Sequence, residues 1–124
     1  MNRTIAASAA AVLLLTSAPA AAAGPGRTAL AVGYSSAGRY AVAVTLRCDP
    51  AGGGHPKKAE ACRLLTRVGG DPARLRPLPL MCTMEYAPVT AWVDGTWRGR
   101  RVKWSHTYGN RCDMNRTTGV LTAF

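Results

Sequence analysis

Few side chains in this sequence are capable of acid–base or nucleophilic chemistry. The 124 residues include six acidic side chains and two histidines, His55 and His106. A small ribonuclease could use Glu85 as a base and one histidine as an acid, with arginines around the phosphate. Nothing in the spacing brings these side chains together, and the motifs of serine hydrolases, P-loop proteins and dinucleotide-binding proteins are absent. We therefore expect a protein that is not an enzyme.

Both histidines are expected to be structural or surface residues. His55 lies in the glycine-rich segment Asp49–Pro56, which predicts an exposed position in a flexible loop. His106 alternates with the bulky residues Trp104 and Tyr108, a pattern typical of a packed or edge position on a strand.

Four cysteines, Cys48, Cys62, Cys82 and Cys112, predict two disulfides. Three pairings are open, and locality favours Cys48–Cys62 and Cys82–Cys112. The rival explanation is zinc, but the sequence has no Cys-x-x-Cys and no His-x3-His pair. We expect neither a metal nor a cofactor.

Residues 1–23 have the pattern of a secretory signal. Arg3 supplies the charge, Ile5 to Thr16 forms an apolar core, and Ala21-Ala22-Ala23 is a small-residue cleavage site. The apolar core is shorter than the roughly 20 residues that span a bilayer, so a membrane anchor is not expected. Residues 24–124 are predicted to form one secreted domain.

The formal net charge is +10, and removal of Arg3 with the signal leaves +9. Such a surface attracts acidic partners, and polyanion binding is one interpretation of it. The arginines are spread along the chain, however, and cluster only in Arg98–Lys103. Nucleic-acid binders concentrate their charge on one face, so we expect a basic surface without a specific nucleic-acid partner.

The sequence predicts an α+β domain with a five-stranded, mostly antiparallel sheet. A longer helix begins near Pro56 and ends at Gly69-Gly70, and a short second helix follows Asp71-Pro72. Together the two helices are expected to cover one face of the sheet. The expected strands are Thr28–Tyr34, Tyr40–Arg47, the two arms of a hairpin that turns at Asp94-Gly95 (its second arm broken at Gly99 and resumed over Val102–Tyr108), and Gly119–Phe124.

The segment Arg76–Pro88 contains three prolines, which exclude a regular helix and favour extended backbone. It is either an exposed functional loop or a connection that buries Met81 and Met84 in the core. A stiff, extended loop suits a protease active site, because it avoids the ordering cost of binding. Met84 lies two residues after Cys82, so its flexible side chain can project outward while a disulfide holds the backbone. The disulfide and the prolines would also retain the new ends if the bond after Met84 were cut.

In these residues the chain resembles the Streptomyces subtilisin inhibitor family of secreted serine-protease inhibitors, over about residues 28–124. The matching segments are Val44-Thr45-Leu46-x-Cys48, Cys62, Val68-Gly69-Gly70-Asp71, Met81-Cys82-x-Met84-x-Tyr86-x-Pro88-Val89, Val93-Asp94-Gly95-x-Trp97-x-Gly99-x-Arg101-Val102, Cys112-x-Met114-Asn115 and Ala123-Phe124.

The resemblance implies a five-stranded sheet with two helices, the pairs Cys48–Cys62 and Cys82–Cys112, and a homodimer built through the sheets. It implies an inhibitor of subtilisin-like proteases, with chymotrypsin-like and trypsin-like enzymes left open as further targets. The small basic ribonuclease or polyanion-binding protein remains the alternative.

The resemblance also assigns the site residues, with Met84–Glu85 as the reactive bond. Asn110 would support the loop. Where the family often has proline before the specificity residue, this chain has Thr83, which predicts a less rigid loop. The residues implied to contact the protease are Met81, Cys82 and Thr83 before Met84, and Glu85, Tyr86 and Ala87 after it.

Overall fold

The computed structural model describes residues 11–12, 14–15 and 27–124. The expected signal, residues 1–23, lies outside the described residues except for 11, 12, 14 and 15, and it stays a prediction. Within the described part, no helix is long and apolar enough to cross a bilayer.

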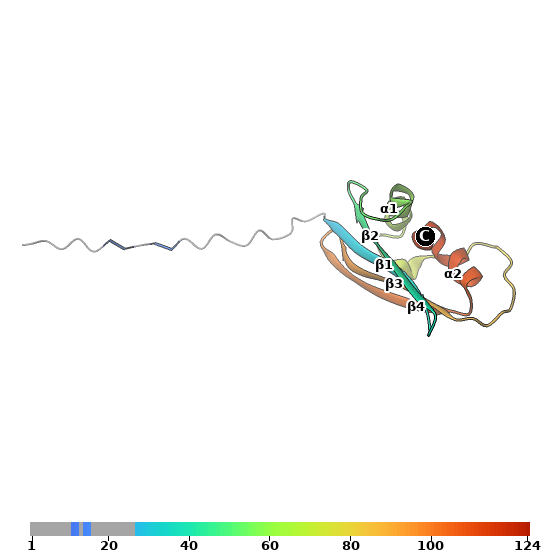
Figure 1. Cartoon of the computed structure of the whole chain (residues 1–124). Coiled ribbons are helices and arrows are strands. Elements are labelled where there is room, and N and C mark those ends of the chain that lie inside the picture. Colours follow the sequence, from blue (N-terminus) through green and yellow to red (C-terminus); the bar gives the residue numbers. More distant parts are fainter. Residues whose placement is uncertain (1–10, 13, 16–26) are drawn as a thin grey trace, which may run out of the picture.

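The described residues form one antiparallel sheet of four strands in the order β2-β1-β3-β4 (Figure 1). The α+β class and the antiparallel pairing are confirmed, but the expectation of five strands is wrong. The strands are β1 (Thr28–Ser36), β2 (Tyr40–Cys48), β3 (Val89–Trp97) and β4 (Arg100–Tyr108).

The expected fifth strand, Gly119–Phe124, is instead a 3-10 helix, η2 (Gly119–Thr122), and a short tail. Leu121 is fully buried in the core, and the Thr118 and Thr122 hydroxyls share a buried hydrogen bond of 2.6 Å. A short apolar run does not distinguish a strand from a buried helical turn. Here the burial of Leu121 and Thr122 in the core accompanies the helical turn.

The expected turn at Asp94-Gly95 is also wrong. Gly95 lies inside β3, paired with Leu30 of β1, and the strand continues until Trp97 is buried. The chain turns four residues later than expected, at Arg98-Gly99, where φ is 45° and 82°. Both central residues of this tight hairpin have positive φ, as the expected turn required, so the turn geometry was right and its position was not.

The longer helix, α1 (Lys58–Arg67), is confirmed. Gly69 and Gly70 end it with φ of 65° and 76°, a conformation that glycine adopts without strain. The expected short helix is the 3-10 turn η1 (Pro72–Arg74), capped by Asp71, whose carboxylate accepts from the Ala73 N–H at 3.0 Å.

A second α-helix, α2 (Arg111–Thr118), was not expected from the sequence. It follows β4 and lies on the same side of the sheet as α1 (Figure 1). One face of the sheet is therefore covered by two helices, as expected, but the second is α2 rather than the segment after Asp71.

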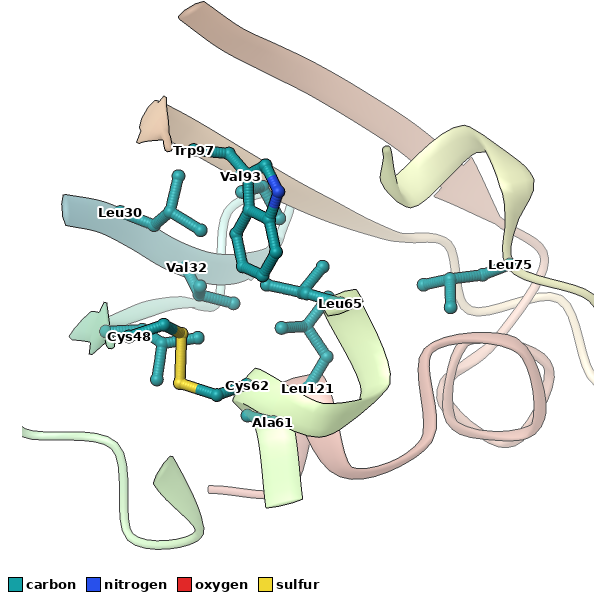
Figure 2. Packing of buried hydrophobic residues seen from close by; sticks show 11 residues of the cluster. Leu30, Val32, Cys48, Ala61, Cys62, Leu65, Leu75, Val93, Trp97 and Leu121 are labelled. Carbon is teal, nitrogen blue, oxygen red and sulfur yellow. A yellow bond between two sulfur atoms is a disulfide. The ribbon is translucent and has the colours of Figure 1, made fainter. Parts of the chain in front are cut away.

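The core lies between this covered face and α1 (Figure 2). The indole of Trp97 and the side chain of Leu65 meet over Val32 and Val93, all at most 2% exposed. The Cys48–Cys62 disulfide ties the end of β2 to α1, which confirms that pair.

His55 is buried, contrary to the expectation of an exposed loop residue. Its Nδ1 accepts from the Lys57 N–H at 2.9 Å, and its Nε2 lies 3.0 Å from the Leu121 carbonyl, to which it donates. The ring also packs edge-on against Phe124. The imidazole thus links the loop after β2 to the C-terminal segment.

Candidate functional site

The segment between η1 and β3 is the longest stretch of the described domain without helix or strand, and Figure 1 shows it swinging out beside α2. The segment joins β3 at Val89, which pairs with Ser36 of β1 and Tyr108 of β4 at one end of the sheet. Met81 and Met84 are 97% and 98% exposed, so the alternative that they are buried in the core is wrong. Large apolar side chains this exposed are typical of a surface that binds a partner.

Asn110 holds the loop on both sides of Met84. Its amide Nδ2 donates to the carbonyl of Thr83 at 3.0 Å and to the carbonyl of Glu85 at 2.8 Å. Its Oδ1 accepts from the Asp113 N–H at 2.8 Å, which makes Asn110 the N-cap of α2. Because the helix fixes the amide, the two carbonyls on either side of Met84 have fixed positions, and the Met84 side chain between them is exposed.

The Cys82–Cys112 disulfide, the second expected pair, is confirmed and joins the loop to the first turn of α2. Cys82 lies two residues before Met84, so the crosslink fixes the chain close to the exposed thioether. On the other side of the loop, the Ala87 N–H donates to the Gly109 carbonyl at 2.8 Å. The loop is therefore anchored at both ends to the segment that starts α2.

Arg116, one turn further along α2, contacts the start of the loop. Its carbonyl accepts from the Leu78 N–H at 2.8 Å, and its guanidinium lies 3.5 Å from the Leu80 carbonyl. Asp113 orients the guanidinium with a 2.6 Å ion pair. The loop thus runs antiparallel to α2 and is held at successive points along the helix.

A cavity of about 460 Å³ lies behind the loop, lined by Leu80 to Tyr86 on one side and by Asn110, Asp113 and Arg116 on the other. The loop backbone is therefore not packed directly on the core. Its shape depends on the disulfide and the hydrogen bonds from α2.

Tyr108 lies near the base of the loop, in the smaller apolar cluster with Val89 and Met114. Burial raises the pKa of its phenol above the usual 10.0, and the Asp113 carboxylate raises it further. The phenol is therefore neutral at physiological pH and acts as a packing group.

The residues proposed for ribonuclease chemistry have separate surroundings. Glu85 is exposed on the loop, His55 is buried against Leu121, and His106 lies on β4 with its ring 4.5 Å from that of Tyr108. In the part of the chain that the structure describes, no group of three or more His, Cys, Asp or Glu side chains could hold a metal. The arrangement does not support the ribonuclease alternative.

The sequence favoured both disulfides, and the resemblance named the loop and Asn110, but α2 and with it Arg116 were not expected. A signal was present. Asn110 followed by Asp113 is an N-cap residue with an acidic residue three positions later, which is typical of a helix start.

The chain matches known proteins over most of its length. The subtilisin inhibitor-like family model matches residues 24–110. The chain is 45% identical over 86 residues to subtilisin inhibitor-like protein 1 of Streptomyces cacaoi, covering 66% of this chain and 78% of that protein. It is 41% identical over 112 residues to a subtilase-type protease inhibitor of Streptomyces coelicolor, covering 86% of this chain and 78% of that protein.

A solved structure is also similar. Streptomyces caespitosus sermetstatin, in complex with Bacillus licheniformis subtilisin, aligns with a TM-score of 0.68 and 35% sequence identity. The alignment covers 80% of this chain and the whole of sermetstatin.

Proposed function

The chain belongs to the subtilisin inhibitor-like family, and we propose from that membership that it is a secreted inhibitor of subtilisin-like serine proteases. It is a binding protein rather than an enzyme. The exposed loop carries the function, and the reactive bond is Met84–Glu85.

The observation that carries the proposal is the position of Met84 between two fixed carbonyls. Its side chain is 98% exposed, while Asn110 bonds the carbonyls of Thr83 and Glu85 on either side. A protease must bind an extended peptide and insert one side chain into its specificity pocket. A loop that already holds this shape loses little conformational entropy on binding, which raises affinity.

The neighbouring residues divide into two groups. Met81, Cys82 and Thr83 precede Met84 and pair with the enzyme as an added strand, with Met81 exposed for a second apolar contact. Glu85, Tyr86 and Ala87 follow the bond and contact the other side of the cleft. Tyr86 is 83% exposed, so its ring is free to contact the enzyme on that side.

The chain inhibits the protease rather than being digested, because contacts within the inhibitor hold the two new ends in place if the reactive bond is cut. Cys82 remains crosslinked to Cys112, and Asn110 bonds one carbonyl on each side of the bond. The new amine therefore stays next to the acyl group, and the effective concentration for resynthesis is high. The cut bond re-forms faster than the ends separate.

Titration of subtilisin with the mature protein tests the function. We expect enzyme activity to fall linearly to zero near one inhibitor chain per active site, and mass mapping after long incubation to find a single nick between Met84 and Glu85. Activity unchanged at micromolar inhibitor would refute the function. Stoichiometric inhibition with a nick elsewhere would refute only the assignment of the reactive bond.

The face of the sheet turned away from the helices supports the proposed homodimer. Small residues cover it on β1 and β2, among them Ala31 and Ala43. Trp92 of β3 packs over Gly33, where any side chain would overlap the indole. A surface of small side chains around one aromatic ring suits a second copy of the same sheet. A dimer mass in light scattering that Ala43→Asp converts to a monomer mass is expected, and an unchanged mass for this variant would place the contact elsewhere.

A further inference from the structure

The turn between β1 and β2 lies at the same end of the sheet as the loop. Ser36 pairs with Tyr40 in β2 and with Val89 in β3, the residue that directly follows the loop. The Arg39 N–H closes the turn on the Ser36 carbonyl at 3.0 Å, and Gly38 supplies a φ of 71°. The turn therefore projects beside the residues that follow the reactive bond.

The turn and the start of α2 share a cavity with residues on either side of Met84. The cavity has a volume of about 170 Å³ and is lined on one side by Arg39, Tyr40 and Arg111, and on the other by Thr83, Glu85 and Ala87. A partner that binds Glu85 and the residues after it would therefore also contact Arg39 and Tyr40.

Two of these side chains are held in place by Tyr34. Tyr40 packs edge-on against the Tyr34 ring, with centroids 6.1 Å apart. The Arg111 guanidinium lies over the same ring at 4.9 Å and donates to the Tyr34 hydroxyl at 2.8 Å. They form a fixed aromatic and cationic surface, which has little entropy to lose when a partner binds.

This surface has unneutralised positive charge. Among the residues that the structure describes, neither Arg39 nor Arg111 lies within 4.0 Å of a carboxylate. Glu85 is the one acidic residue that lines the shared cavity. The surface therefore complements a partner that carries carboxylates where it faces the turn.

The size of a protease interface gives a second reason to extend the contact beyond the loop. Protease–inhibitor complexes engage roughly 20–30 residues on each side. The loop from Met81 to Ala87 offers only seven, and all further contacts must come from segments that flank it. On the side after the reactive bond, one such segment is the β1–β2 turn, which adjoins Val89 through Ser36.

We propose that Arg39, Tyr40 and Arg111 form a second protease-contacting surface, which selects enzymes with carboxylates along the part of the cleft that binds residues after the reactive bond. The inference rests on the proposed function, since it names the partner of the same loop. Charged residues at the rim of an interface act mainly on the association rate and its salt dependence. Arg39 therefore steers the encounter, and Tyr40 prolongs the complex.

The test compares Arg39→Glu with Arg63→Glu, an equal charge reversal at an exposed position on α1, in a different surface region. Association rates with Bacillus licheniformis subtilisin are measured by stopped flow at low and at physiological salt. We expect Arg39→Glu to slow association about three- to tenfold at low salt and to flatten its salt dependence. Arg63→Glu is expected to change the rate by less than about twofold, and Tyr40→Ala to raise the dissociation rate.

The outcomes distinguish failure of the proposed surface from failure of the proposed function. If both charge reversals slow association equally, only the net charge matters and the second surface is refuted. If Arg39→Glu and Tyr40→Ala both behave like wild type while wild type inhibits, the proposed function stands and the surface is refuted. A wild-type chain that does not inhibit overturns both. Circular dichroism of each variant checks that it is folded.

Discussion

Replacement of Asn110 tests whether the shape of the loop depends on the two hydrogen bonds that the Asn110 amide donates to it, here called the clamp. The side chain makes three hydrogen bonds, to the carbonyls of Thr83 and Glu85 at 3.0 and 2.8 Å and from the Asp113 N–H at 2.8 Å. Asn110→Ala removes all three. Asn110→Asp keeps the acceptor that caps α2 but replaces the amide donor with a carboxylate oxygen facing two carbonyls. The two variants therefore separate loss of the cap from loss of the clamp.

The magnitudes follow from the number of bonds lost. A hydrogen bond contributes a net of about 1 kcal/mol, and loss of an N-cap costs about 1 kcal/mol. Asn110→Ala should therefore lower the free energy of unfolding by about 3 kcal/mol, and Asn110→Asp by about 1 kcal/mol less. A loop without its clamp must be ordered on binding, at a cost of up to about 2 kcal/mol, or roughly a 30-fold higher inhibition constant.

The assay pairs urea unfolding with inhibition of subtilisin on a chromogenic peptide substrate. Both variants are expected to inhibit more weakly and to be nicked faster than wild type, with Asn110→Asp the more stable of the two. Asn115→Ala, at an exposed position on the same helix, serves as the control. If Asn110→Asp inhibits as tightly as wild type, the amide does not hold the loop and the reasoning fails.

Three further predictions concern the specificity residue, the crosslink and the core. Met84→Lys should shift inhibition toward trypsin-like enzymes, because a cation suits a pocket with a carboxylate; unchanged selectivity against a protease panel would move the reactive bond elsewhere. Changing both Cys82 and Cys112 to Ser should turn the inhibitor into a consumed substrate, and recovery of full subtilisin activity with time would show it; durable inhibition would mean that the crosslink does not retain the ends. Gly70→Ala should lower the free energy of unfolding by about 2 kcal/mol or more, because φ is 76° and a Cβ would overlap the Trp97 ring. Gly69→Ala, with a φ of 65° and only the Arg74 guanidinium 3.5 Å away, should lose only about 1 kcal/mol; equal losses in urea unfolding would remove the role of the Trp97 contact.

The parts of the fold that the sequence predicted correctly depend on local chemistry. The alternation in Tyr40–Arg47 predicted β2, and Gly69-Gly70 predicted the end of α1. Cysteine spacing favoured the two disulfides that the structure contains.

The errors depend on contacts between segments that are distant in sequence. Asp94-Gly95 has turn chemistry, yet pairing of Gly95 with Leu30 keeps β3 extended until Trp97 reaches the core. His55 lies in a glycine-rich loop, yet the Leu121 carbonyl, 66 positions away, accepts a hydrogen bond from its ring, and the side chain is buried. No local pattern in either segment indicates the distant partner.

The same distinction applies to the loop. The prolines before Met84 account for the extended start of the loop, but Thr83 and Glu85 carry no such constraint, and Thr83 in place of the family's proline predicted a less rigid loop. These two residues are the ones whose carbonyls Asn110 holds, and Cys112 and Arg116 of the same helix hold the segment before them. Rigidity at Met84 therefore comes from α2, the element that was not expected, rather than from the backbone of the loop. It follows that proline at position 83 would add little to inhibition in wild type but would restore part of what Asn110→Ala loses.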